Sequence, residues 1–180
     1  MNIKEMFLLL IMVLSVIGFG YAVYYSFFST PDFNAVGKNT VVTLVKIIPD
    51  KNGVKGDYTF NCNGEIRTVG GGGVIWGAIC GDKYEALYDS SNCRHVKILF
   101  YRPVFSDTEI VGVTTGEIYQ VGPPFIFKPF VKFKYSVGER MYERFQNLEK
   151  YPEVKKGAKF PVKYWVENPK RSIIYIEKNK

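Results

Sequence analysis

The side chains that could do chemistry are few in this sequence of 180 residues, and they are widely spaced. His95 is the only histidine, so a Ser-His-Asp or Cys-His arrangement would have to use it. Such mechanisms need several ionisable side chains that converge in a pocket, and one histidine does not provide them. We therefore interpret His95 as an outward-facing polar residue of a strand, with Arg171 at the matching position of the internal repeat described below.

Three cysteines, Cys62, Cys80 and Cys93, are the other candidate metal ligands. Together with His95 they could form a Cys3His zinc site, but structural zinc sites usually contain cysteines about two to four residues apart. No two cysteines here are that close. Two of the three could instead form a disulfide and leave one unpaired, or all three could be small buried residues. We expect no metal site, no cofactor and no catalytic residue.

The glycine run Gly70–Gly73 is the only candidate for a phosphate-binding loop. A P-loop requires a Lys-Ser/Thr pair at the start of the following helix, whereas Val74, Ile75 and Trp76 follow here. The run therefore predicts a flexible loop. Trp76 beside it could pack in the core or insert into a lipid interface or a partner.

An aromatic and basic segment follows two prolines in the second half of the chain. It contains Phe125, Ile126, Phe127, Lys128, Phe130, Lys132, Phe133 and Lys134. The pattern suits a strand covered on both faces or a partner surface. It would also suit single-stranded nucleic acid, which barrels bind through aromatic rings and basic grooves. We expect no nucleic-acid partner, because the topology predicted below places the domain outside the cytoplasm.

The middle third of the chain is repeated in the last third. The separation is constant at 76 positions, from 81 to 157 and from 88 to 164. The repeated residues are Gly81, Lys83, Tyr84, Ala86, Tyr88 and Asn92, which return as Gly157, Lys159, Phe160, Val162, Tyr164 and Asn168. Upstream, Tyr58, Phe60 and Cys62 match Phe133, Tyr135 and Val137, and Val45–Ile47 is echoed by Gly116–Ile118. A fixed period indicates a duplicated structural unit.

Short alternating apolar runs predict about five strands in each unit. They are separated by turn signals such as Asn63–Gly64, and the segment 142–155 could hold a short helix. The predicted fold class is mainly β, with two tandem small barrel-like units of the SH3 or OB type; a single β-sandwich is the alternative. The predicted organisation is a transmembrane anchor at 1–28, a linker at 29–39, unit one at 40–105 and unit two at 106–180.

The anchor is predicted from the run Met6–Phe28, which contains no charged residue. A helix needs roughly 20 such residues to cross a bilayer core. The run continues past the poor cleavage candidate at Gly20–Ala22, which favours an uncleaved anchor over a cleaved signal peptide. Lys4 precedes the run, so we expect a cytoplasmic N-terminus and an extracytoplasmic C-terminal domain.

The closing half of each unit resembles a bacterial family of small membrane-tethered β domains of unknown function. The family phrase is roughly Gly-x-x-Val-x-Val-x-Tyr-x-x-x-Asn-Pro. Gly157, Val162, Tyr164, Asn168 and Pro169 match it, whereas unit one has Cys93 in place of the proline and Leu87 before its tyrosine. The resemblance implies a membrane-tethered β module and supplies no catalytic residue.

We therefore expect a single-pass membrane protein whose β units form a non-catalytic interaction or accessory module of a bacterial envelope assembly. Its expected partners are the lipid bilayer and other envelope proteins. The alternative is a cytoplasm-facing basic module that binds nucleic acid or anionic lipid, which the net charge of +7 would favour. An envelope enzyme is a third hypothesis without a visible site.

Overall fold

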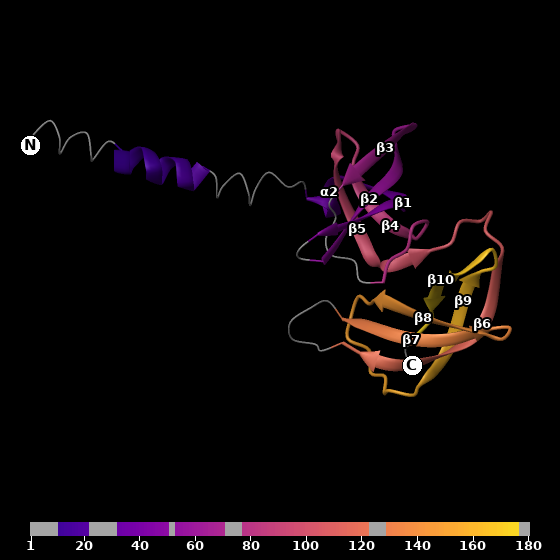
Figure 1. Ribbon diagram of the computed structural model, residues 1–180. Coiled ribbons are helices and arrows are strands. Elements are labelled where there is room, and N and C mark those ends of the chain that lie inside the picture. The colour runs from indigo at the N-terminus through magenta and orange to yellow at the C-terminus, as the bar shows by residue number, and fades with distance from the viewer. Residues whose placement is uncertain (1–10, 22–31, 51–52, 71–76, 123–128, 177–180) are drawn as a thin grey trace, which may run out of the picture.

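The computed structural model describes residues 11–21, 32–50, 53–70, 77–122 and 129–176. Ten strands form two antiparallel sheets of five strands each (Figure 1). The mainly β prediction is confirmed. The first sheet contains β1 (Gly37–Asp50), β2 (Gly53–Cys62), β3 (Glu65–Gly70), β4 (Lys83–Asp89) and β5 (Asn92–Val104), in the order β3-β2-β1-β4-β5.

The second sheet repeats this arrangement. It contains β6 (Val111–Val121), β7 (Phe130–Val137), β8 (Arg140–Asn147), β9 (Lys159–Trp165) and β10 (Asn168–Ile174). Its order, read from the other edge, is β8-β7-β6-β9-β10, which is the order of sheet one strand for strand. We call residues 37–104 unit one and residues 111–176 unit two. A central first strand with its hairpin on one side and the closing hairpin on the other is the plan of a small, partly open barrel.

The registers show which residues are equivalent. Leu44 pairs with Tyr58 in unit one, and Ile118 pairs with Phe133 in unit two. Tyr88 pairs with Val96, and 76 positions later Tyr164 pairs with Ser172. The repeat in the closing strands therefore holds in three dimensions. The predicted match of Ile118 with Ile47 is wrong by three positions, because the structural counterpart of Ile118 is Leu44.

Each unit has its own hydrophobic core, built from alternate residues of the strands. The core of unit one contains Val42, Leu44, Tyr58, Phe60, Cys62, Tyr84, Ala86 and Tyr88. That of unit two contains Ile118, Val131, Phe133, Tyr135, Val162 and Ile174. Most aromatic side chains of the sheets therefore point inward. The two repeated tyrosines differ, since Tyr88 is buried and Tyr164 is only half-buried.

The two units link strands from opposite sides of their sheets by different means. In unit two, the side-chain amide of Gln146 on β8 donates to the Ile174 carbonyl on β10 and accepts from the Ile174 N–H. These bonds bridge the open edges, so this sheet is nearly a barrel. In unit one, a disulfide joins Cys62 at the end of β2 to Cys93 in β5, with a Cα–Cα distance of 6.1 Å.

The predicted transmembrane anchor at 1–28 is wrong for the part of the chain that the structure describes. Residues 11–21 are helical, and no helix among the described residues is long and apolar enough to cross a membrane. The single-pass membrane localisation and the extracytoplasmic placement depended on this anchor and are corrected with it.

Two smaller predictions also need correction. The predicted linker at 29–39 contains the short helix α2 (Phe33–Val36) and the first residues of β1. The segment 142–155 continues β8 to Asn147 and then runs without a helix. Tyr142 and Arg144 there lie two positions apart on the edge strand β8, so their spacing follows strand alternation.

Candidate functional site

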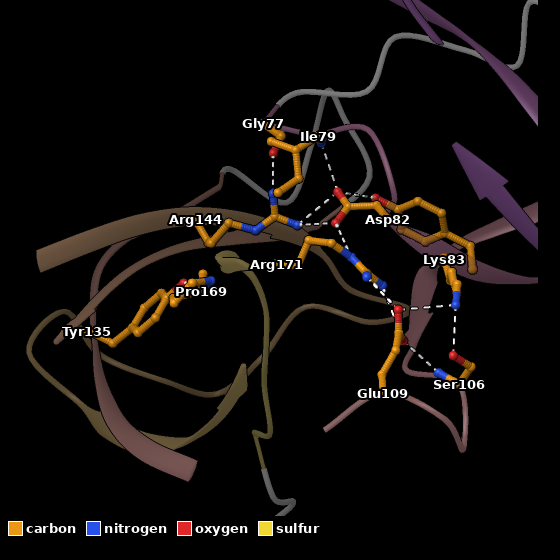
Figure 2. A network of polar contacts seen from close by, with 11 residues as sticks. Gly77, Ile79, Asp82, Lys83, Ser106, Glu109, Tyr135, Arg144, Pro169 and Arg171 are labelled. Atoms are coloured by element: carbon orange, nitrogen blue, oxygen red, sulfur yellow. Dashed lines mark hydrogen bonds and ion pairs between the residues drawn. The ribbon is translucent and has the colours of Figure 1, made fainter. Parts of the chain in front are cut away.

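Six polar side chains meet where the two units contact each other (Figure 2). Asp82 and Lys83 come from the start of β4, Ser106 and Glu109 from the connection between β5 and β6, Arg144 from β8 and Arg171 from β10. We call this set the interunit cluster. It is the densest group of ionisable side chains among the residues that the structure describes. It unites positions that lie as far apart as 82 and 171.

Arg144 binds the connection that leads into β4. Its Nη2 donates to both carboxylate oxygens of Asp82, at 3.0 and 2.9 Å, and its Nη1 donates to the Gly77 carbonyl at 2.7 Å. Asp82 also accepts from the backbone N–H of Ile79 at 2.9 Å. The Asp82 and Arg144 side chains are only 7% and 8% exposed. This geometry is a two-pronged, charge-assisted contact in a site from which most water is excluded.

Arg171 is even more buried, with 3% of its side chain exposed. Its Nη1 donates to Glu109 Oε1 at 2.5 Å, and its Nε lies 3.8 Å from Asp82 Oδ1. The guanidinium also lies 4.8 Å from the ring centre of Trp165, within cation–π distance. Arg171 therefore contacts both carboxylates of the cluster.

Glu109 receives donors from three directions. Besides Arg171, the Lys83 ammonium donates to Oε1 at 3.1 Å and the Ser106 N–H donates to Oε2 at 2.8 Å. Burial raises the pKa of the Glu109 carboxyl, but the hydrogen bonds from Arg171, Ser106 and Lys83 outweigh it and lower the pKa to about 2. Glu109 is thus ionised at neutral pH.

Local backbone geometry brings the connection before β4 onto unit two. Gly77 has φ +68°, and a Cβ on it would lie 2.7 Å from Cβ of Phe145 in β8. Gly81 has φ +92° and lies against the Arg171 side chain, with Cδ at 3.5 Å from the position of a Cβ. A side chain at either position would be strained by the left-handed backbone, and at Gly77 it would also clash. These glycines let the connection pack against the arginines.

One pair in the cluster has the composition of a catalytic dyad. The Lys83 ammonium donates to Ser106 Oγ at 2.8 Å, and a Ser-Lys pair can act as nucleophile and base. The base must be a neutral amine, however. Lys83 also donates to Glu109 Oε1 at 3.1 Å, so its ammonium has two acceptors within the cluster. The arrangement is that of an ion-pair network between the two units.

His95 lies apart from the cluster. Its side chain is 40% exposed, and Nδ1 is 3.7 Å from Asp89 Oδ2. The side-chain and backbone hydrogen bonds from Ser91 lower the pKa of Asp89. The pair lies at the turn between β4 and β5, where the Ser91 hydroxyl donates to Asp89 Oδ1 at 2.6 Å. Ser91 and His95 therefore share Asp89 as a partner, and the described contacts do not include a hydrogen bond from Ser91 to His95. The outward-facing interpretation fits His95 but fails for its counterpart Arg171, which is buried by unit one.

The cysteines do not converge on a metal site. Cys62 and Cys93 form the disulfide of unit one, and Cys80 is free and exposed. Within the described ranges, no three His, Cys, Asp or Glu residues lie close enough to hold a metal ion. The disulfide was one of the alternatives that the sequence left open.

Other candidate segments lie partly outside the described residues. Positions 71–76, with most of the glycine run and Trp76, are among these, as are 123–128 with Phe125, Ile126, Phe127 and Lys128. Phe133 is buried in the core of unit two, and Phe130 stacks on Phe145 with ring centres 4.6 Å apart. The Phe133 ring is therefore not exposed for stacking on a base.

The interunit cluster does not follow from the motifs that the two units share. Its key residues occupy positions where the repeats differ: Asp82 is matched by Ala158, and Arg171 by His95. The available signal was a charged residue in one unit with a different residue type at the equivalent position of the other unit. It shows that the position has a role beyond building the barrel.

Unit two also carries a hollow on its outer face. It has a volume of about 360 Å³ and is lined by Thr114, Thr115, Gly116, Glu117, Lys134, Tyr135, Ser136, Met141 and Lys159. Val113 and Met141, at its side, are 66% and 67% exposed. Lys134 forms an ion pair with Glu117 at 3.6 Å. We call Val111, Val113, Met141 and the lining of this hollow the outer patch.

The chain matches no protein-family model, and it has no significant match among curated proteins or solved structures. The resemblance of the closing motif to membrane-tethered domains therefore stays a prediction.

Proposed function

We propose that this protein is a non-catalytic protein-interaction module that binds a partner through the outer patch of unit two. The observation that carries the proposal is the mutual pairing of the ionisable groups in the interunit cluster. Each carboxylate there accepts from an arginine, and Lys83 is bound to Glu109. Ionisable side chains that are paired with one another across the two units in this way hold the units together.

The outer patch has the properties of a contact surface. Val113 and Met141 expose most of their apolar side chains on adjacent parts of one face. Lys134 and Lys159 flank the hollow, and Glu117 lies between them in the register. An apolar centre with charged residues at its edge is common in protein interfaces. The pattern favours a partner protein with apolar and acidic side chains.

A photo-crosslinking residue placed at position 113 or 141 of the full chain, expressed in its native cells, tests this proposal. We expect one discrete adduct from each position. Ile66 on β3 is the matched control, because it is an exposed apolar residue of unit one with 71% exposure. Position 66 should give no adduct. The absence of an adduct at both 113 and 141 would contradict the proposal.

Two further variants separate binding from catalysis. Ser106→Ala removes the only serine that a lysine of the cluster contacts, and His95→Ala removes the only histidine. The adducts at positions 113 and 141 should persist in both variants, since neither residue is part of the outer patch. Loss of the adduct in a folded His95→Ala or Ser106→Ala protein would favour an enzyme.

A polyanion such as single-stranded nucleic acid is the second candidate for the same face. Lys132, Lys134, Lys159 and Lys163 lie on outward positions of β7 and β9. The inward orientation of Phe133 and Tyr135 weighs against it, because single-strand binders stack bases on exposed rings. Salt-sensitive binding of a single-stranded oligonucleotide, lost when Lys134 and Lys159 become glutamates, would favour this candidate over a protein partner.

A further inference from the structure

Within the described strands, β6 lacks a neighbour on one side over its first half. It pairs with β9 from Val111 to Glu117, whereas its pairing with β7 begins only at Gly116. The residues Val111–Thr115 therefore have a partner strand on the β9 side alone. This free edge borders the hollow of the outer patch, which provides a volume of about 360 Å³ beside it.

The backbone of Val113 presents a hydrogen-bond donor and an acceptor on this edge. The Ile118 N–H donates to the Ala158 carbonyl, and the Ile118 carbonyl accepts from the Gly157 N–H, so both groups point to the side of β9. Along a strand these directions alternate from one residue to the next. The register between β6 and β9 has no shift, so the N–H and C=O of Val113 point to the opposite side. No described strand pairs with Val113 there.

The side chains beside the edge indicate the composition of a chain that could add to it. Val113 and Met141 are 66% and 67% exposed, so they offer apolar contacts. Lys159 lines the hollow and has no ion pair among the described side chains, whereas Lys134 lies 3.6 Å from Glu117. Two lysines and one glutamate leave one positive charge at this surface. An added strand with apolar and acidic side chains on its outer face would complement both features.

We infer that the outer patch binds its partner through one extended segment, which adds to the free edge of β6 as a further strand. This inference rests on the proposed interaction function and adds the conformation and composition of the ligand. The segment bonds to the N–H and C=O of Val113. On the face towards the hollow, an apolar side chain packs against Met141, and an acidic side chain two positions away contacts Lys159. Main-chain hydrogen bonds provide affinity in this mode of binding, and the alternate side chains provide specificity.

Unit one has a similar free edge but different side chains around it. Its first strand, β1, pairs with β4 before its pairing with β2 begins. Thr59 lies at the position equivalent to Lys134, and Lys83 is the counterpart of Lys159. Lys83 is already bound to Glu109 within the interunit cluster. The acidic segment therefore distinguishes unit two from unit one.

The first experiment measures the binding of two synthetic peptides to the full chain by fluorescence anisotropy. The acidic peptide, Thr-Val-Thr-Glu-Thr-Val-Thr-Glu with blocked ends, places valine and glutamate on one face of a strand. The control peptide has lysine in place of both glutamates. We expect saturable binding of the acidic peptide and about tenfold weaker binding of the control, because like charges would meet. Equal binding of the two peptides, or no binding of either, would overturn the inference.

Matched variants at one position separate the backbone from the side chain. Val113→Pro removes the N–H on the free edge and leaves the hydrogen bonds to β9 in place. Val113→Ala keeps that N–H and removes most of the apolar side chain. In folded protein, the proline should weaken binding of the acidic peptide about tenfold or more, and the alanine should weaken it less. Equal losses in the two variants would contradict the addition of a strand.

The same test on the peptide does not depend on the folding of a variant. N-methyl groups are placed either on both valines or on both threonines that follow them. The N–H groups of these two sets point to opposite sides of an extended chain, and only one side faces β6. One methylated peptide should therefore lose binding and the other should keep it. Any other result would overturn the inference.

The crosslinking test at positions 113 and 141 distinguishes failure of this inference from failure of the proposed function. Adducts at both positions, without binding of the acidic peptide, would show that the outer patch contacts its partner in another way. The inference would then be overturned while the proposed function holds. Absence of both the adducts and the peptide binding would overturn the two together.

Discussion

The two units have the same strand order but are stabilised by different interactions. In unit one, the end of β2 is joined to β5 by the Cys62–Cys93 disulfide. The equivalent positions in unit two are Val137 and Pro169, and there the Tyr135 hydroxyl donates to the Pro169 carbonyl. A covalent link in one barrel thus corresponds to a hydrogen bond in the other.

Two of the positions that join the units carry different residues in the two repeats. Asp82 of unit one is matched by Ala158, and Arg171 of unit two is matched by His95. Lys83 is the exception, because it is part of the interunit cluster and returns as Lys159. The apolar pairs Leu44–Tyr58 and Ile118–Phe133 occupy equivalent positions and fill the two cores. A change of residue type at a charged position was therefore a signal for the interface, although it does not find every residue there.

The largest expected effect comes from comparing Arg171→Ala with His95→Ala. Arg171 is 3% exposed and is paired with Glu109, whereas His95 is 40% exposed. Removing one partner of a buried ion pair leaves an uncompensated charge and costs about 3–5 kcal/mol. A surface substitution such as His95→Ala should change the free energy of unfolding by about 0.5 kcal/mol or less. Urea unfolding followed by fluorescence measures both.

Equal losses in the two variants would mean that the interunit cluster is no more important than an ordinary surface pair. Arg171→Met serves as the control, because it keeps a long side chain against Trp165 and removes only the charge. It should be about as destabilising as the alanine variant, since Glu109 loses its arginine in both.

The sequence allows the mainly β fold and the strands of the two sheets to be predicted, because their information is local and repeated; of the two predicted barrels, only the sheet of unit two is nearly a barrel. Alternation at Tyr58, Phe60 and Cys62 is sufficient to place one face of a strand inward. The interunit cluster could not be derived in this way. It depends on how two finished barrels dock, and no local pattern relates Asp82 to Arg144 or Arg171. The anchor was predicted from hydropathy alone, and no helix among the described residues is long and apolar enough to cross a membrane.

The second prediction concerns the disulfide of unit one. Replacing Cys62 and Cys93 by alanine should destabilise the protein by about 2–4 kcal/mol, because the link closes a loop with a separation of 31 residues. Cys80→Ala is the matched control, since Cys80 is free and exposed, and it should have little effect. Calorimetric unfolding with and without reductant measures the loss. Reductant should lower the Tm of the Cys80→Ala protein and leave that of the double variant unchanged.

The third prediction concerns how the stability that Glu109 contributes to the contact between the units depends on pH. The pKa of Glu109 is lowered from its ordinary value of 4.5 to about 2 in the folded protein. Its ionised form therefore stabilises the fold above pH 4.5, and this contribution is lost as the pH falls from 4.5 towards 2. We expect a loss of about 2–3 kcal/mol from this group over that range.

Glu109→Gln is the control for the pH dependence, because glutamine keeps the shape and does not titrate. Unfolding free energies measured from pH 6 to pH 2 should fall less steeply in the variant than in the natural protein. Parallel curves would show that Glu109 contributes nothing to the acid sensitivity. The other carboxylates would then have to account for it.

The smallest expected effect is that of Tyr135→Phe, which removes the hydroxyl and keeps the ring. In Figure 2 the Tyr135 side chain points to Pro169, whose carbonyl accepts its hydrogen bond. Phe60 occupies the matching position in unit one and has no hydroxyl. The variant therefore gives unit two the same side chain at this position, but unit two still lacks the disulfide of unit one. The loss of one half-buried hydrogen bond should cost about 0.5–1.5 kcal/mol in urea unfolding. Tyr119→Phe, which removes an exposed hydroxyl 3.3 Å from Glu143, should cost less. If Tyr135→Phe has no effect, the bond to Pro169 does not replace the disulfide, and the core alone closes that end of unit two.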